Sequence, residues 1–360
     1  METNKRMGSD MADRAQLALR ELFWNPDTRM YDIETPCPGG VCNTIFHYWW
    51  MAHAVETLVD GLTRTGNAQY SATLNELYEG LLRRNGGAWP NALYDDMEWM
   101  AIGWLRAYEA TKEEKYKQAA LVLWADVKTG WNDHMGGGIA WQKSQLDYKN
   151  TPANAPAVIL AARLHRAFGN GEDLEWAIRI YDWQKKTLVD PDSGFVWDGA
   201  NRTGDGTIDK VWEFTYCQGV FVGAAHELYR TTGDESYLLD AERTANVAFA
   251  RLTNKDSSLL PNEGKGDGGL FKGILVRYAA NLASDYPDRF PELANLIMRN
   301  AMSMWNEGRE TNLTLFGPDW NKPPESPVEL GTQISGIILL EMAAKLEELG
   351  IPFPMSIETT

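Results

Sequence analysis

The sequence has few cysteines, few cations and no long apolar run, and each shortage excludes a class of protein. Three cysteines, Cys37, Cys42 and Cys217, are too few for a disulfide scaffold and lack the paired spacing of a metal site. The 34 Lys and Arg against 50 Asp and Glu leave a net charge of −16, which disfavours nucleic acid or an anionic membrane as partner. No apolar segment approaches the roughly 18 residues that span a bilayer. Because residues 1–20 lack an apolar signal-peptide core, we expect a cytoplasmic location, and secretion only if Met1 is not the natural start.

Tryptophan, in contrast, is abundant. The chain of 360 residues contains 15 Trp besides 14 Tyr and 11 Phe, while apolar residues make up 44% and charged residues 23%. The overall balance is that of a globular protein with a sizeable core. A tryptophan supplies a flat apolar face and one hydrogen-bond donor, which suits either a core or a surface that stacks on ring-shaped ligands.

A helix–turn–helix unit recurs along the chain. Its clearest turns are Thr65-Gly66-Asn67, Thr111-Lys112-Glu113 and Thr232-Gly233-Asp234, with fainter copies at 168–170 and 284–286. Apolar residues on both sides of the turns repeat with i, i+3, i+4, i+7 spacing, which predicts amphipathic helices. Glycine at positive φ ends the first helix, and Asn or Asp caps the second.

The repeat predicts an all-α fold. Helices near 11–23 and 332–349 supply a further hairpin from the two ends of the chain. About twelve helices in six hairpins predict a closed (α/α)6 toroid, or barrel, as a single catalytic domain over residues 1–360. The connections between hairpins are long, which is typical of functional segments, and we expect them to gather at one end of the barrel. These connections are 25–48, 85–96, 130–154, 190–217, 255–272 and 305–331.

Asp95 and Asp96 form the only Asp-Asp pair in the chain and directly precede a predicted helix. Acids at a helix start have a plain structural interpretation, because they cap free N–H groups and complement the helix dipole. The pair lies on the loop side of the predicted barrel, among aromatic residues, and this favours a catalytic role. A glycosidase needs two carboxylates, and repulsion between neighbouring carboxylates leaves a proton on one of them for the leaving group.

Aromatic, amide and glycine residues of the connections are the candidates for holding a sugar, which offers apolar ring faces and hydroxyl edges. For each, a structural interpretation stays open: a buried aromatic, a solvated lysine, an N-cap, or a partner for buried backbone. The predicted substrate-binding residues are Tyr94, Trp99, Trp131, Gly137, Gly138, Trp141, Lys149, Asn150, Asn154, Tyr216 and Gln218.

These segments together resemble glycoside hydrolase family 76, the α-1,6-mannanases. The matching stretches are YDDMEWMAIGWLRAYEAT (94–111), GGGIAWQKSQLDYKN (136–150) and TYCQGVFVGAAHELYRTTGDESYL (215–238), with weaker support at 47–61 and 179–199. The resemblance implies an (α/α)6 barrel and retaining endo-hydrolysis of α-1,6-linked mannan or mannooligosaccharides. It also implies Asp95 as nucleophile, Asp96 as acid/base, and neither a metal nor an organic cofactor.

Several alternatives remain open from the sequence. A transglycosylase or a non-catalytic sugar-binding protein fits the same scaffold. A sugar epimerase needs histidines at the mouth of the barrel, and an unsaturated-uronide hydrolase needs basic residues there. Few of either fall in the connections, so a neutral sugar is favoured.

Three weaker signals favour no separate function. The segment 264–269 (GKGDGG) has the glycine spacing of a dinucleotide loop, but no predicted strand precedes it. Residues 201–212 resemble the start of a calcium loop but have Trp212 in place of the closing glutamate. Cys37 and Cys42 are close enough in sequence to pair in an oxidising compartment, although spacing alone does not show it.

Overall fold

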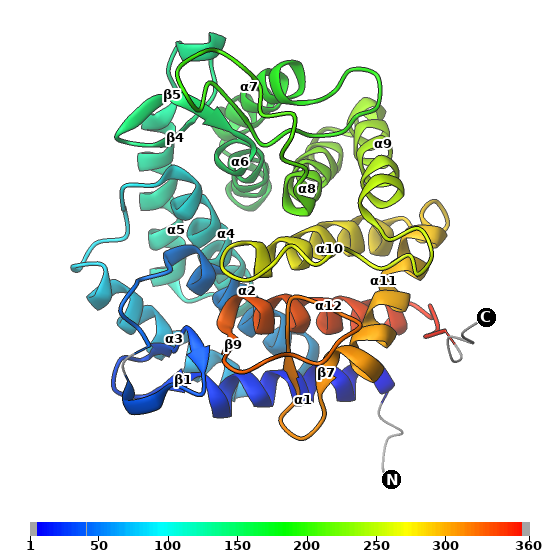
Figure 1. Ribbon diagram of the computed structural model, residues 1–360. Helices are drawn as coiled ribbons and strands as arrows, with labels where there is room; N and C mark the ends of the chain where they lie inside the picture. Colours follow the sequence, from blue (N-terminus) through cyan, green and yellow to red (C-terminus); the bar gives the residue numbers. More distant parts are fainter. Residues whose placement is uncertain (1–5, 41, 355–360) are drawn as a thin grey trace.

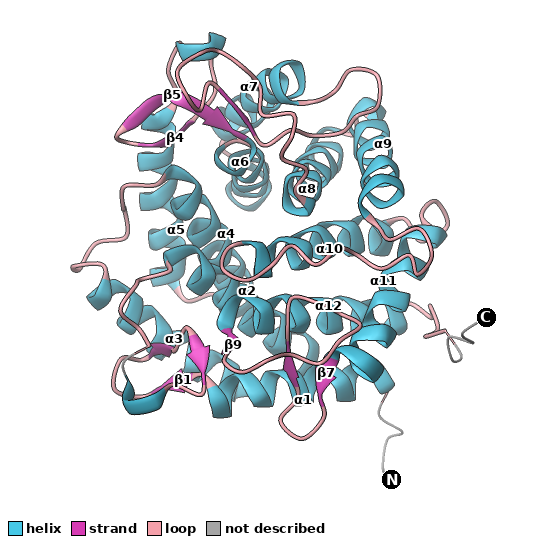
Figure 2. Cartoon of the chain, viewed as in Figure 1, coloured by secondary structure: helices cyan, strands magenta, loops and turns pink. Residues whose placement is uncertain are grey.

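The computed structural model describes residues 6–40 and 42–354, and these are mostly α-helical (Figure 2). Within this part of the chain no helix is both long and apolar enough to cross a lipid bilayer. The α-helices of the described residues are α1 (Met7–Leu22), α2 (Tyr48–Thr65), α3 (Ala68–Arg84), α4 (Tyr94–Thr111), α5 (Glu114–Val127), α6 (Ala155–Phe168), α7 (Gly171–Leu188), α8 (Thr215–Thr232), α9 (Glu235–Leu252), α10 (Gly268–Asp285), α11 (Pro291–Ser303) and α12 (Leu330–Glu348).

The even-numbered helices form a closed inner ring. Contacts run from α2 through α4, α6, α8 and α10 to α12, and α12 returns to α2. The odd-numbered helices lie outside this ring, each against its hairpin partner (Figure 1). The first and last helices, α1 and α12, pack together as the sixth hairpin. The structure therefore confirms the predicted (α/α)6 barrel.

The hairpin turns follow the logic of the repeat. Gly66, Gly169 and Gly233 end their helices in the left-handed conformation, with φ of 66°, 74° and 75°. The next residue in each case caps the following helix, and its side chain accepts a hydrogen bond from the backbone N–H two residues on. The α4–α5 turn differs, because Lys112 adopts φ 61° without the freedom of glycine and Glu113 makes no side-chain cap.

Short strands pair within and between the long connections (Figure 2). Strands β1 and β2 form one antiparallel pair, β3 and β9 a second and β7 and β8 a third, while β4, β5 and β6 form a three-stranded sheet. The strands are β1 (Trp24–Asn25), β2 (Met30–Tyr31), β3 (Glu34–Thr35), β4 (Ala140–Gln142), β5 (Gln145–Asn150), β6 (Gly199–Ala200), β7 (Arg309–Glu310), β8 (Leu315–Phe316) and β9 (Val328–Glu329). The β3–β9 pair joins the first connection to the last, and the β5–β6 pair joins the connection at 130–154 to that at 190–217.

The core is continuous through all the helices, but it contains buried charge as well as apolar side chains. Between α2, α4 and α10, Asp60 accepts from Arg106 Nη2 at 2.6 Å and lies 2.8 Å from Arg277 Nη2. On the other side of the ring, Glu227 of α8 pairs with Arg163 of α6 at 2.6 Å. These pairs join inner helices to one another, and in each the carboxylate is buried, so its charge depends on the arginine partners.

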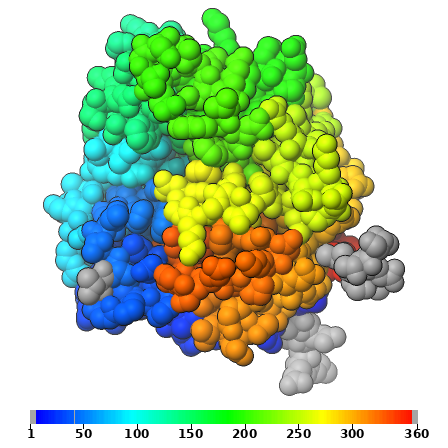
Figure 3. Space-filling view, in the orientation of Figure 1, coloured from blue at the N-terminus to red at the C-terminus, as the bar shows by residue number. Residues whose placement is uncertain are grey.

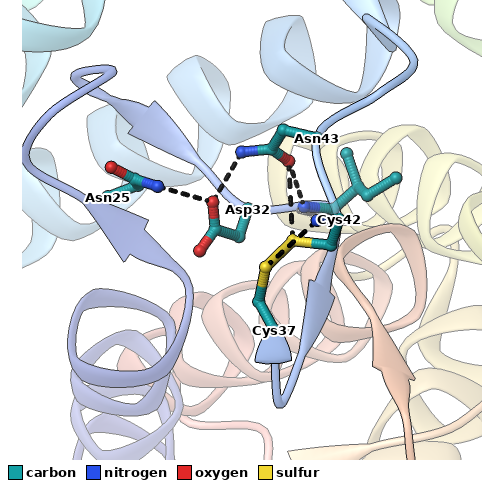
Figure 4. The surroundings of a disulfide bond; sticks show 6 residues. Asn25, Asp32, Cys37, Cys42 and Asn43 are labelled. Carbon is teal, nitrogen blue, oxygen red and sulfur yellow. Dashed lines mark hydrogen bonds between the residues drawn. A yellow bond between two sulfur atoms is a disulfide. The ribbon is translucent and has the colours of Figure 1, made fainter. Parts of the chain in front are cut away.

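Cys37 and Cys42, whose pairing the sequence left open, are joined in a disulfide next to β3 (Figure 4). Beside it, the Asp32 carboxylate accepts hydrogen bonds from Asn25 Nδ2 at 3.0 Å and Asn43 Nδ2 at 2.5 Å. Asp32 and the two sulfurs are the one set of potential metal ligands that the described residues bring together, and the sulfurs are bonded to each other. The disulfide thus closes a short loop on the path from β3 to α2.

Candidate active site

A cleft of about 490 Å³ opens where the long connections meet at one end of the barrel. Its walls come from the connections at 25–48, 85–96, 130–154, 190–217 and 255–272 and from the helix starts that come after them. The last connection, 305–331, contributes none of the lining residues. The predicted gathering of the connections is therefore observed for the other five.

Asp95 and Asp96 lie together in this cleft, in the first turn of α4. Asp95 accepts two hydrogen bonds, from Trp141 Nε1 to Oδ2 at 3.0 Å and from the backbone N–H of Asp96 to Oδ1 at 2.9 Å. Asp96 accepts one side-chain hydrogen bond, from Asn91 Nδ2 to Oδ2 at 3.0 Å. Donors stabilise the charged form of a carboxyl group, so Asp95 is the better prepared of the two to be ionised.

Burial raises the pKa of both aspartates. For Asp95, burial is the largest cause, and the hydrogen bonds from the Asp96 N–H and from Trp141 work against it. The pKa of Asp96 is raised first by burial and then by the neighbouring charge of Asp95. Two neighbouring buried carboxylates favour one shared proton, and the two donors on Asp95 favour its charged form, so the proton is expected on Asp96. A carboxylic acid beside a carboxylate can supply a proton donor and a nucleophile or base to one bond.

The sequence profile of "Glycosyl hydrolase family 76" matches residues 11–348, which is nearly the whole chain.

The chain belongs to glycosyl hydrolase family 76.

Solved structures agree with this membership. A Listeria innocua protein superimposes on this family 76 chain with a TM-score of 0.90 and 38% identity, over 96% of this chain and 99% of the other. The alpha-1,6-mannanase GH76A of Salegentibacter sp. superimposes with a TM-score of 0.89 and 39% identity, over 95% and 100%. That structure is of an inactive variant with alanine at two consecutive aspartates, in complex with alpha-1,6-mannotetrose.

Curated relatives are more distant. The mannan endo-1,6-alpha-mannosidase DCW1 of Candida glabrata is 29% identical over 205 residues, which is 52% of this chain and 45% of that protein. A putative mannan endo-1,6-alpha-mannosidase of Schizosaccharomyces pombe matches over 62% of its own length. The chain thus spans 45% and 62% of the length of these two curated relatives.

Four of the predicted substrate-binding residues line the cleft of this family 76 chain: Trp99, Trp141, Asn150 and Tyr216. The Tyr216 hydroxyl donates to Asp198 Oδ1 at 2.8 Å. Trp141 has a second role beside any stacking on a sugar, because its indole N–H is bonded to Asp95. The structure thus brings these residues together with the aspartate pair.

The other predicted substrate-binding residues lie outside the lining and support the loops behind it. The buried Lys149 Nζ donates to the Gly138 carbonyl at 2.8 Å. Asn154 bonds both the N–H and the C=O of Ile139, and Gln218 does the same for Val196. Buried backbone groups need partners, and these polar side chains supply them.

Two glycines and two aromatic residues complete this supporting set. A Cβ at Gly137 or Gly138 would lie within 3 Å of the Trp183 ring, so these glycines permit close packing of loop on α7. The ring of Trp131 lies under the Arg179 guanidinium, 4.1 Å from its centre. Tyr94 is buried, and its hydroxyl lies 3.4 Å from Thr129 Oγ1. These four residues therefore support the loops behind the cleft.

The lining residues that were not predicted as site residues include His47, Trp49, Asp198, Asp267 and Phe271. They come from the starts of α2 and α10 and from the connection before β6, and no shared motif marks them. The glycine-rich segment around Asp267 stands out in the sequence for its spacing alone. The one sequence signal that could have found these residues is their position, because each lies in or just after a long connection.

Proposed function

We propose that the chain is a retaining endo-α-1,6-mannanase that acts on α-1,6-linked mannan or mannooligosaccharides. The observation that carries the proposal is the unequal hydrogen bonding of the Asp95–Asp96 pair in the cleft, with two donors on Asp95 and one side-chain donor on Asp96. Membership of family 76 and the likeness to an alpha-1,6-mannanase that is inactive without two consecutive aspartates support the choice of substrate.

In this proposal Asp95 attacks the anomeric carbon and Asp96 gives its proton to the leaving glycosidic oxygen. The C–O bond to the leaving sugar breaks as the bond from Asp95 Oδ to the anomeric carbon forms. Asp96, now ionised, takes a proton from water, and that water releases the sugar from Asp95. Two displacements at one carbon retain its configuration. Each step uses groups of this chain and water alone.

The alternatives differ in the fate of the sugar after the first displacement or in the groups that act on it. A transglycosylase passes the sugar from Asp95 to another sugar hydroxyl in place of water. A sugar-binding protein holds the chain without breaking it. An epimerase would use histidine, and among the described lining residues only His47 is of that type. Burial lowers the pKa of His47, which favours its neutral form.

The deciding experiment is incubation with linear α-1,6-mannan and with short α-1,6-mannooligosaccharides, monitored by NMR. New reducing ends that appear first as the α-anomer support the proposal. First appearance of the β-anomer overturns retention. Binding without cleavage favours the sugar-binding alternative, and longer products favour transglycosylation.

The two roles are separated by Asp95→Ala and Asp96→Ala, tested with an activated aryl α-mannoside and azide. In Asp96→Ala, azide attacks the sugar held on Asp95, so we expect an α-mannosyl azide. In Asp95→Ala, azide takes the place of the nucleophile, so we expect a β-mannosyl azide. Asp192→Asn, an exposed aspartate outside the cleft, is the control and keeps wild-type turnover. The reverse pattern of azides would exchange the roles.

The cytoplasmic location remains a prediction, and the disulfide gives it a test. Structural disulfides are typical of oxidising compartments and rare in the cytosol. A thiol count on protein blocked with alkylating agent at lysis distinguishes the two. Three free thiols support the cytoplasm, whereas one, the buried Cys217, supports an oxidising compartment.

A further inference from the structure

The glycine-rich segment before α10 brings a third carboxylate into the cleft. Asp267 lines the same cleft as Asp95 and Asp96, and its negative charge contributes to the raised pKa of both. The surrounding segment, around residue 265 in yellow, lies exposed between the green and orange parts of the chain in Figure 3. Gly268 leaves no room for a side chain, because a Cβ there would lie 2.1 Å from the Glu263 carbonyl. The backbone directly after Asp267 is therefore packed closely against the Glu263 backbone.

The Asp267 carboxylate is oriented but not neutralised. Trp49 Nε1, from the start of α2, donates to its Oδ1 at 3.1 Å. No lysine or arginine of the described chain forms an ion pair with it, and its neighbour Lys265 instead donates to the Pro327 carbonyl. A carboxylate has about four acceptor sites, so one indole N–H leaves acceptors free, all of Oδ2 among them.

An aromatic surface lies beside this carboxylate. Trp49 and Phe271 both line the cleft, with ring centres 6.3 Å apart, and Phe271 is itself stacked on Tyr216 at 4.1 Å. Phe271 lies four residues after Asp267, at the start of the same helix. An apolar ring face next to a free carboxylate matches a pyranose, whose C–H face stacks on aromatic rings while its hydroxyls donate to the acid.

We propose that Asp267, Trp49 and Phe271 form a sugar subsite next to the Asp95–Asp96 pair, in which Asp267 accepts hydrogen bonds from two adjacent hydroxyls of one mannose unit. This inference rests on the proposed function and adds a specificity-determining residue to it. Asp267 binds and orients the sugar and transfers no proton. Trp49 holds the carboxylate in place through its indole N–H.

Binding is tested in the Asp95→Asn/Asp96→Asn double variant, which cannot cleave, by calorimetry with α-1,6-mannotetraose. Adding Asp267→Ala should weaken binding about 10- to 100-fold, because charge-assisted hydrogen bonds to sugar hydroxyls are lost. Adding Trp49→Phe, which keeps an aromatic ring but removes the indole N–H, should weaken binding less than Asp267→Ala does. Adding Lys265→Ala, in the same segment but outside the cleft, is the matched control and should leave the Kd within about twofold.

A second measurement separates binding from general disruption of the loop. Asp267→Asn in the active protein removes a negative charge that faces Asp95, Asp96 and His47. Because that charge raises the pKa of Asp96, its loss should move the basic limb of the kcat/KM profile to lower pH. Trp49→Phe keeps the charge and should leave that limb in place.

The experiments distinguish failure of the Asp267 subsite from failure of the proposed function. If the wild-type protein cleaves α-1,6-mannan and Asp267→Ala binds mannotetraose as tightly as the double variant alone, the subsite is wrong and the function stands. An equal loss of binding in Lys265→Ala also overturns it, because the effect then belongs to the segment. If the wild-type protein neither cleaves nor binds α-1,6-mannooligosaccharides, both proposals fail together.

Discussion

At the scale of single residues, the chemistry depends on how two adjacent, identical side chains are made different. Both lie in the first turn of α4, and both have a raised pKa. Asp95 accepts hydrogen bonds from the indole N–H of Trp141 and the backbone N–H of Asp96, whereas Asp96 accepts a side-chain hydrogen bond only from Asn91. Trp141 donates to Asp95 alone and Asn91 to Asp96 alone. Removing one of these donors should therefore move only the limb of the pH–rate profile that is set by its own aspartate.

Trp141→Phe should move the acidic limb of kcat/KM to higher pH by about one unit. The substitution removes a hydrogen bond that favours ionised Asp95, so its pKa rises and the nucleophile is lost at a higher pH. A pH–rate series on a soluble mannooligosaccharide measures the shift. An acidic limb that stays in place would contradict the assignment of Asp95 as the group that must be ionised.

Asn91→Ala should move the basic limb to higher pH and lower kcat. Asn91 favours ionised Asp96, so its removal raises the pKa of Asp96 and extends the range in which that group holds its proton. The rate falls because the carboxyl group loses the contact that orients it. The same series serves as measurement, and Trp141→Phe is the matched comparison. Movement of the acidic limb alone would exchange the two roles.

At the scale of elements, the short hairpin turns join the paired helices of the barrel, and the long connections carry the residues of the cleft. Thr65, Thr111 and Thr232 each donate to the carbonyl four residues earlier and accept from the N–H two residues later. The repeated Thr in the sequence is therefore a local device that closes one helix and starts the next. It needs no long-range partner, which is why the pattern alone was sufficient to find it.

The α4–α5 turn is the weak copy of this device, so Lys112→Gly should stabilise the protein by about 0.5–1 kcal/mol. Lys112 has φ 61°, a conformation that costs a side-chain-bearing residue energy. The converse change, Gly233→Ala at φ 75°, should destabilise by about 1 kcal/mol. Space is not the cause, because no atom lies within 4 Å of a Cβ built at Gly233. Urea unfolding of both variants tests the pair, and a loss of stability in Lys112→Gly would contradict it.

At the scale of the whole molecule, buried ion pairs join the helices of the inner ring. Glu227 of α8 contacts Arg163 and Arg166 of α6. Burial alone would raise the pKa of Glu227, but the charges of Arg163, Arg166 and Arg230 outweigh it and lower the pKa to about 2. Ionised Glu227 therefore contributes an attraction between α6 and α8 in addition to their apolar packing.

Glu227→Gln should lower the free energy of unfolding at pH 7 by about 2–3 kcal/mol, since the buried side chain loses charge-assisted hydrogen bonds to the partly exposed guanidinium groups of Arg163 and Arg166. The pKa of Glu227 is lower in the folded than in the unfolded state, so its contribution is present above the unfolded value of 4.5 and is lost as pH falls toward about 2. The difference in stability between wild type and variant should therefore shrink over that range. Urea unfolding from pH 7 to pH 3 measures it, with the exposed Glu292→Gln as control. A difference independent of pH would contradict the argument.

The local pattern of the sequence was sufficient for the barrel and for the aspartate pair. Helical periodicity, glycine at the turns and capping residues are short-range signals, so the hairpins and the pairing of α1 with α12 were predicted. Asp95 and Asp96 were found because an Asp-Asp pair at a helix start is itself unusual. Neither inference required knowing which side chains meet across the barrel.

The tertiary structure alone decided which polar residues face the cleft. Lys149, Asn154 and Gln218 have the residue types of a sugar site, but they are turned to buried backbone groups that would otherwise lack partners. Trp49 and Asp267 lie 218 residues apart in the chain and meet only because the closed ring brings α2 and α10 to the same mouth. Periodicity specifies which face of a helix is apolar, whereas the direction of a loop side chain depends on partners from distant segments, which no local pattern records.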